Sequence, residues 1–112
     1  MNMDIGTFVG WYIPGMMALF SLPMAMGIVP PNRFYGFRTA KTLSSPRIWY
    51  AANQRAGWLL FTAGVISLLW NFWLTHIVHG MPLPMMRMWI AIIPPSCAIG
   101  AVLAMFAYLR KL

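Results

Sequence analysis

Residues 56–78 read AGWLLFTAGVISLLWNFWLTHIV, a stretch without Asp, Glu, Lys or Arg. About 20 consecutive apolar residues are enough for an α-helix to cross the hydrocarbon core of a bilayer. Trp58 lies near one end of the stretch, and Trp70 and Trp73 lie towards the other. Because Trp side chains are favoured at the headgroup level, this stretch predicts a transmembrane helix.

Two more uncharged stretches, residues 5–29 and 88–109, flank this one. The third stretch contains Pro94 and Pro95 in succession, which predict a kink or a local unwinding because two amide donors are lost. Hydrophobic residues make up 61% of the 112 residues, too many for a soluble domain of this size to bury. We therefore expect an all-α integral membrane protein, a single domain with three transmembrane helices.

Positive charges are concentrated on one side of these spans. Loop 30–55 and the C-terminal tip carry Arg33, Arg38, Lys41, Arg47, Arg55, Arg110 and Lys111. Arg87 lies on the other side. Because Lys and Arg in short loops are retained in the cytoplasm, we expect a multi-pass plasma-membrane protein with its N-terminus outside and its C-terminus cytoplasmic.

The formal net charge of +7 would also suit a nucleic-acid-binding protein. In a membrane protein, however, such charges set the topology and contact anionic headgroups. The expected partners are therefore the lipid bilayer, in particular anionic phospholipid, and no nucleic acid.

The first loop and the start of the second span read PPNRFYGFRTAKTLSSPRIWYAANQRAG from Pro30 to Gly57. Ser45 before Pro46 predicts a helix N-cap followed by proline at the first helical position. Trp49, Asn53 and Gly57 then share one helix face, because they are four residues apart. We expect a short interfacial helix in this loop; the alternative is a helix that continues into the second span.

The loop contains a set of residues at fixed offsets: Asn32, Arg33, Gly36, Phe37, Arg38, Thr39, Thr42, Leu43, Trp49, Asn53 and Gly57. This pattern resembles the SdpI family of bacterial membrane proteins, in which an Asn-x-x-x-Gly-x-Arg-Thr-x-x-Thr-Leu stretch leads into a Trp-bearing helix. The family's namesake confers immunity against a secreted killing peptide and holds a repressor at the membrane. The resemblance implies a bacterial inner-membrane protein with a protective role.

Arg38, Thr39 and Thr42 would suit an anion site, with a guanidinium fork, two hydroxyl donors and a glycine, Gly36, that permits close backbone approach. Lipid phosphate is the expected ligand. In the alternative interpretation Arg38 bonds to carbonyls of its own loop, Thr39 caps a turn and Trp49 is a membrane anchor. The candidate lipid- or partner-binding residues are Asn32, Arg33, Gly36, Arg38, Thr39, Thr42, Trp49 and Asn53.

Small and polar residues recur at helical spacing in all three spans. They are Gly6 and Gly10 in the first, Gly64, Ser67 and Asn71 in the second, and Ser96 and Gly100 in the third. Small residues let helices approach closely, and an Asn in hydrocarbon needs a partner. We expect packing seams between spans or between copies of the chain; a cavity lined by Asn71 is the alternative.

Catalytic and metal-binding residues are sparse. Asp4 is the only acidic residue, and the sequence contains neither a phosphate-binding glycine loop nor a nucleophile elbow. His76 and His79 lack a carboxylate or cysteine companion, and Cys97 is a lone cysteine. We expect a protein that is not an enzyme and uses no cofactor and no metal.

Two functions are consistent with these features. The first is an SdpI-like immunity protein that resists a membrane-active peptide by binding the toxin or its lipid target. The second is a small structural or accessory subunit, which docks on a larger membrane complex or on another copy through its seams and binds lipid headgroups through its loop.

Overall fold

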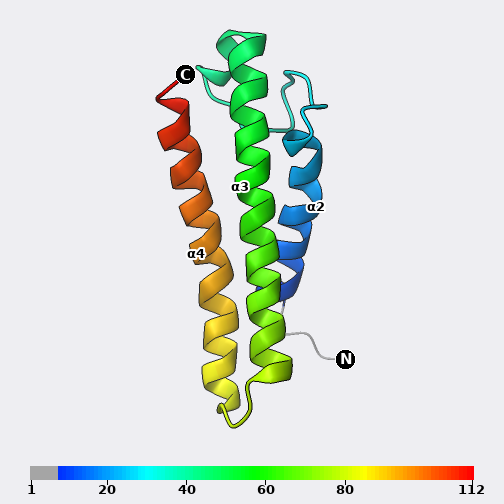
Figure 1. Ribbon diagram of the computed structural model, residues 1–112, viewed down its shortest axis with the longest axis vertical. Coiled ribbons are helices and arrows are strands. Elements are labelled where there is room, and N and C mark those ends of the chain that lie inside the picture. The colour runs from blue at the N-terminus through cyan, green and yellow to red at the C-terminus, as the bar shows by residue number, and fades with distance from the viewer. Residues whose placement is uncertain (1–7) are drawn as a thin grey trace.

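The computed structural model describes residues 8–112, and these contain helices and no strand (Figure 1). In chain order the elements are η1 (Phe8–Tyr12), α2 (Ile13–Ala25), η2 (Thr42–Ser44), α3 (Pro46–Phe72), η3 (Trp73–Ile77) and α4 (Leu83–Leu109). The elements η1 and η3 are π-helical, and η2 is a 3-10 turn. The predicted all-α class with three helices is therefore confirmed.

The three α-helices lie side by side, with α3 between α2 and α4 (Figure 1). The molecule measures 52 × 27 × 19 Å. Its longest dimension exceeds the roughly 40–45 Å thickness of a bilayer with its headgroups. Two helices, Pro46–Ile77 and Leu83–Leu109, are long and apolar enough to cross a membrane. Their outward side chains are large and apolar; Leu69 and Leu103, for example, are 63% and 65% exposed. Such a surface points to contact with lipid.

Helix α2 ends at Ala25, before the expected boundary at residue 29. Gly27 adopts φ +73° and its amide donates to Met24 O, while the amide of Ile28 donates to Pro23 O. These two bonds form a Schellman motif, which satisfies the last carbonyls of the helix and turns the chain away. The connection to α3 therefore spans residues 26–45, which we call the loop cap.

Helix α3 starts at Pro46, as predicted, and the Ser45 side chain accepts a hydrogen bond from the amide of Ile48 at 3.2 Å. It then continues to Phe72 without a break. The expected separate interfacial helix is thus wrong, and the alternative, a continuous helix, is what forms. The reason is that no residue between Pro46 and Gly57 interrupts the hydrogen bonding, while the Trp49 face is buried in line with the rest of the helix.

Helix α4 begins at Leu83 and stays helical through Pro94 and Pro95. Of the kink or local unwinding expected at this pair, the local unwinding does not occur. Each proline removes one amide donor, but helices in a bilayer tolerate prolines when neighbouring helices cover them. Pro94 is buried, and both prolines adjoin the Pro14 region of α2.

The α2–α3 interface depends on glycines of α3. A Cβ at Gly57 would overlap the backbone of Ala25, and a Cβ at Gly64 would lie 2.7 Å from Pro14 O. Ser67 and Asn71 continue this buried seam. The Asn71 side-chain amide donates to Gly10 O, which ties η1 to α3.

The other small residues of the expected seams lie elsewhere. Gly6 is outside the described residues. Ser96 and Gly100 of α4 are exposed, and a Cβ at Gly100 would meet no atom within 4 Å. The small residues of α3 thus pack inside this chain, whereas those of α4 face outward.

Two matched glycine substitutions test the α2–α3 seam. Gly57→Ala should lower the free energy of unfolding by about 1–3 kcal/mol, because the methyl group overpacks against α2. Gly100→Ala should leave stability unchanged or raise it by up to about 1 kcal/mol, because only helix propensity changes there. Denaturant unfolding in detergent, followed by circular dichroism, measures both. Equal effects of the two substitutions would contradict the close contact at Gly57.

Candidate functional site

The loop cap begins with a turn held by Asn32. Its side-chain oxygen accepts hydrogen bonds from the amides of Phe34 and Tyr35, at 2.8 and 2.7 Å, and its side-chain amide donates to Pro30 O at 2.8 Å. Asn favours such turns because its side chain replaces a backbone partner. Asn32 is thus a structural residue of the cap.

Asn53 of α3 holds the middle of the cap. Its side-chain oxygen accepts from the amide of Phe37 at 2.6 Å, and its side-chain amide donates to Phe37 O at 3.2 Å and to Trp49 O at 3.0 Å. Asn53 is 2% exposed, so both polar groups of Phe37 would lack partners without it. The Asn53 side chain therefore fixes the middle of the cap to α3.

Trp49 and Gly36 pack directly around this contact. Trp49 is completely buried, and its indole N–H donates to Val29 O at 2.8 Å. Gly36 has φ +119°, and a Cβ there would lie 2.7 Å from Asn53 Oδ1 and 3.1 Å from the Trp49 ring. Only glycine suits this conformation and this space. The interpretation of Trp49 as a membrane anchor is thus wrong; it closes the base of the cap.

Thr39 and Thr42 bind each other. The amide of Thr39 donates to Thr42 Oγ1 at 2.7 Å, and the amide of Thr42 donates to Thr39 Oγ1 at 3.1 Å. The Thr42 hydroxyl donates to Thr39 O at 3.1 Å, and Thr42 is fully buried. Both hydroxyls hold a turn, so the expected anion site with two free hydroxyl donors does not form.

The cap also contacts the C-terminal end of α4. Lys41 Nζ donates to Leu109 O at 2.8 Å, where an ammonium group suits the partial negative charge of a helix C-terminus. The rings of Phe37 and Phe106 meet edge to face at 5.2 Å. The cap, α3 and α4 therefore form one packed unit.

Arg33 and Arg38 are the remaining charged residues of the motif, and both are exposed. Within residues 8–112, Arg38 forms no hydrogen bond and no ion pair, so the alternative in which it binds carbonyls of its own loop is not seen. The guanidinium group is thus available to bind an anion.

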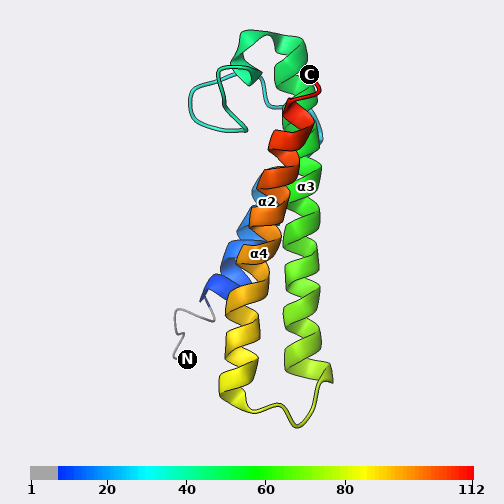
Figure 2. The ribbon, with the colours of Figure 1, turned by 90° about the vertical axis from the view of Figure 1, so that its left-hand side faces the viewer.

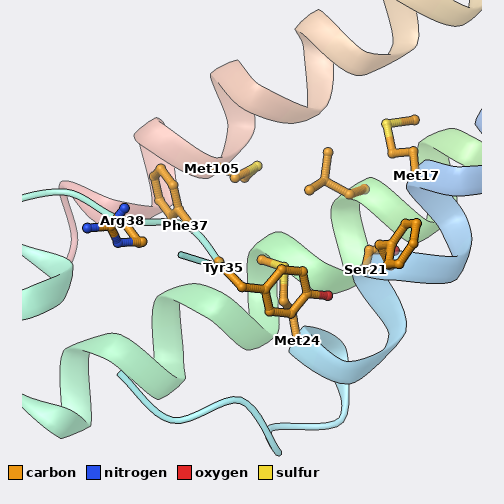
Figure 3. Close-up of a pocket in the computed structure, with 10 residues that line it drawn as sticks. Met17, Ser21, Met24, Tyr35, Phe37, Arg38 and Met105 are labelled. Atoms are coloured by element: carbon orange, nitrogen blue, oxygen red, sulfur yellow. The ribbon is translucent and has the colours of Figure 1, made fainter. Parts of the chain in front are cut away.

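A cavity of about 340 Å³ lies under the cap (Figure 3). It is lined by Met17, Phe20, Ser21 and Met24 of α2, Tyr35, Gly36, Phe37 and Arg38 of the cap, Leu60 of α3 and Met105 of α4. The Tyr35 side chain extends towards α2, while Arg38 lies beyond Phe37 at the edge (Figure 3). The cavity thus combines an apolar interior with a cationic rim.

The Tyr35 hydroxyl is buried and has no hydrogen-bond partner in the described part of the chain. Desolvation by burial raises the pKa of this phenol above its usual value of 10.0. The hydroxyl therefore keeps its proton and is an unpaired donor buried in the cavity wall.

The opposite end of the bundle contains two histidines, His76 and His79. His76 stacks on Phe72 with ring centroids 4.5 Å apart, and His79 is exposed. Among residues 8–112, no three His, Cys, Asp or Glu side chains gather in a way that would hold a metal ion. The positive charges of the cap and of the C-terminal tip lie together at the far end, where Figures 1 and 2 show the loop beside the C-terminus.

Comparison with known sequences identifies one family. The model of the SdpI/YfhL protein family matches residues 28–108, which include most of the cap, all of α3 and nearly all of α4. Comparisons with curated proteins and with solved structures find no match.

Removal of the Asn53 amide tests its role in the cap. Asn53→Ala should cost about 1–3 kcal/mol for each buried backbone group that loses its partner. Arg47→Ala is the matched control, because Arg47 lies on the same helix and is exposed. Hydrogen exchange of the cap amides should accelerate in Asn53→Ala only. Unchanged exchange at Phe37 would contradict the proposed clamp.

Proposed function

Since the chain belongs to the SdpI/YfhL protein family, we propose that it protects a bacterial cell against a membrane-active peptide, with the loop cap and the cavity under it as the working site. Family membership and two long apolar helices together point to a membrane protein. The protective role is proposed by analogy with the family's namesake, and it requires no catalysis.

The observation that carries this proposal is that most residues of the motif fold the cap, whereas Arg38 does not. Asn32, Gly36, Thr42 and Asn53 all serve to fold the cap. Arg38 has no such role, yet the fold holds it exposed at the cavity rim. A charged side chain displayed on a rigid turn, with no structural partner, is suited to binding an external group.

The charge distribution supports a cytoplasmic location for the cap. Positive residues gather at the end of the bundle that holds the cap and the C-terminus, while Arg87 lies close to the start of α4 at the other end. Positive charges are retained in the cytoplasm during insertion. In this orientation the cavity lies at the level of the inner leaflet, where it would meet a toxin peptide, or the lipid that the peptide targets, after the peptide has entered the bilayer.

A second function, an accessory subunit or a homo-oligomer, is favoured by one feature. A groove between α3 and α4 is lined by Cys97, Gly100, Ala101 and Ala104, and it is open on this chain. Small residues on an outward face allow another helix to approach closely. A subunit would be degraded without its partner, whereas an immunity protein would accumulate when expressed alone.

Cysteine labelling tests the orientation. In a Cys97→Ser background, Ser44→Cys places a thiol in the exposed part of the cap, and His79→Cys places one in the α3–α4 turn. A membrane-impermeant maleimide added to intact cells should label His79→Cys and leave Ser44→Cys unlabelled until the membrane is opened. The reverse pattern would overturn the orientation.

A pair of arginine substitutions tests protection. Arg38→Gln should abolish survival of cells challenged with a membrane-active killing peptide, because the free guanidinium group is lost. Arg47→Gln removes another exposed charge from the same end of the bundle and should retain protection. Immunoblots of membrane fractions establish that both variants accumulate equally. Full protection by Arg38→Gln would contradict the proposed working site.

A further inference from the structure

The cavity under the cap has a specific combination of walls. Three methionines, Met17, Met24 and Met105, contribute flexible apolar side chains from α2 and α4. Methionine adapts its shape to irregular apolar partners. The volume of about 340 Å³ is at the lower end of the roughly 300–1,000 Å³ typical of small-molecule sites. The interior therefore suits an apolar chain better than a hydrated ion.

Two polar groups act on such an occupant from different positions. The Tyr35 hydroxyl is buried in the cavity wall without a partner, so it is a donor that an oxygen acceptor reaching it would satisfy. The Arg38 guanidinium lies at the rim, and no residue from 8 to 112 is acidic. An anion that complements this rim is therefore not supplied by any side chain of the described residues.

From these features we infer that the cavity binds one anionic phospholipid of the surrounding leaflet, with an acyl chain among the methionines and the phosphate on Arg38. The ester carbonyl, which joins chain and headgroup in a phospholipid, accepts the hydrogen bond of Tyr35. A guanidinium group binds phosphate through two parallel hydrogen bonds, which selects an anionic headgroup. This site differs from the one expected from Thr39 and Thr42, because those hydroxyls are occupied within the cap.

The inference names the ligand of the site that the proposed function uses, and it rests on that function only for the choice of site. It requires no toxin, so binding is measurable on the full-length protein in detergent. Native mass spectrometry with increasing concentrations of dioctanoyl phosphatidylglycerol should show one tightly retained lipid. Dioctanoyl phosphatidylcholine should bind more weakly, and inorganic phosphate should not compete. Equal retention of both lipids, or competition by inorganic phosphate, would overturn the inference.

Variants assign the binding to the cavity. Arg38→Gln should weaken phosphatidylglycerol binding about tenfold or more, because a charge-assisted contact is lost. Tyr35→Phe should weaken it by a factor of a few, and Met17→Trp should block it by filling the cavity. Arg47→Gln and Tyr50→Phe are the matched controls, since neither residue lines the cavity. Circular dichroism verifies that all variants are folded. A loss of affinity in the controls equal to that in Arg38→Gln and Tyr35→Phe would contradict the assignment.

The outcomes separate this inference from the proposed function. Lipid binding that depends on Arg38, in a protein that gives no protection, supports the lipid site and refutes the protective role. Protection that survives Tyr35→Phe and Met17→Trp, together with lipid binding that no variant changes, refutes the lipid site and leaves the protective role in place.

Discussion

The hydrogen bonds between the Asn53 side chain and the backbone of Phe37 connect the loop cap to α3 at a buried position. One amide satisfies both polar groups of a buried residue, sixteen positions earlier in the sequence. Water is scarce at such a site, and an unsatisfied backbone group there is costly. The orientation of the whole loop cap follows from this contact, because Phe37 then meets Phe106 on α4 and Gly36 lies against Trp49.

The consequence for function is that the cap presents its basic side chains from a defined backbone. Asn32 shapes one turn and the Thr39–Thr42 pair shapes the next, with Arg38 close to the second turn. A preorganised group loses little freedom when it binds, which raises affinity without additional contacts. The same folding leaves Tyr35 unpaired above a cavity of methionines. The position of Arg38 at the rim and the unsatisfied phenol thus both result from the packing of the cap.

Much of the architecture could be predicted from local sequence. Uncharged stretches of bilayer length indicated three helices, and Ser45–Pro46 indicated the start of α3, because hydropathy and capping act over a few residues. Local sequence left two questions open: whether residues 46–57 form a separate helix or the start of α3, and whether Pro94 and Pro95 kink or unwind α4. Both depend on which neighbouring helix covers the segment, and no local pattern contains that information.

The candidate site was predictable only in part for the same reason. The motif located Arg38 and the residues around it, but spacing does not reveal whether a hydroxyl is free, and the Thr39 and Thr42 hydroxyls are engaged with each other. No sequence pattern indicated a role for Tyr35 or Met105. Both residues line one cavity only after α2, the cap and α4 have assembled.

The bond from Lys41 to Leu109 O joins the first loop to the last turn of α4. During synthesis on the ribosome, residues 26–45 emerge long before Leu109. The loop therefore lacks this hydrogen-bond partner while α3 and α4 are being synthesised. The contact between the cap and α4 is complete only when Leu109, 68 positions after Lys41, has been synthesised. A chain that lacks Leu109 therefore cannot form this bond between the loop cap and α4.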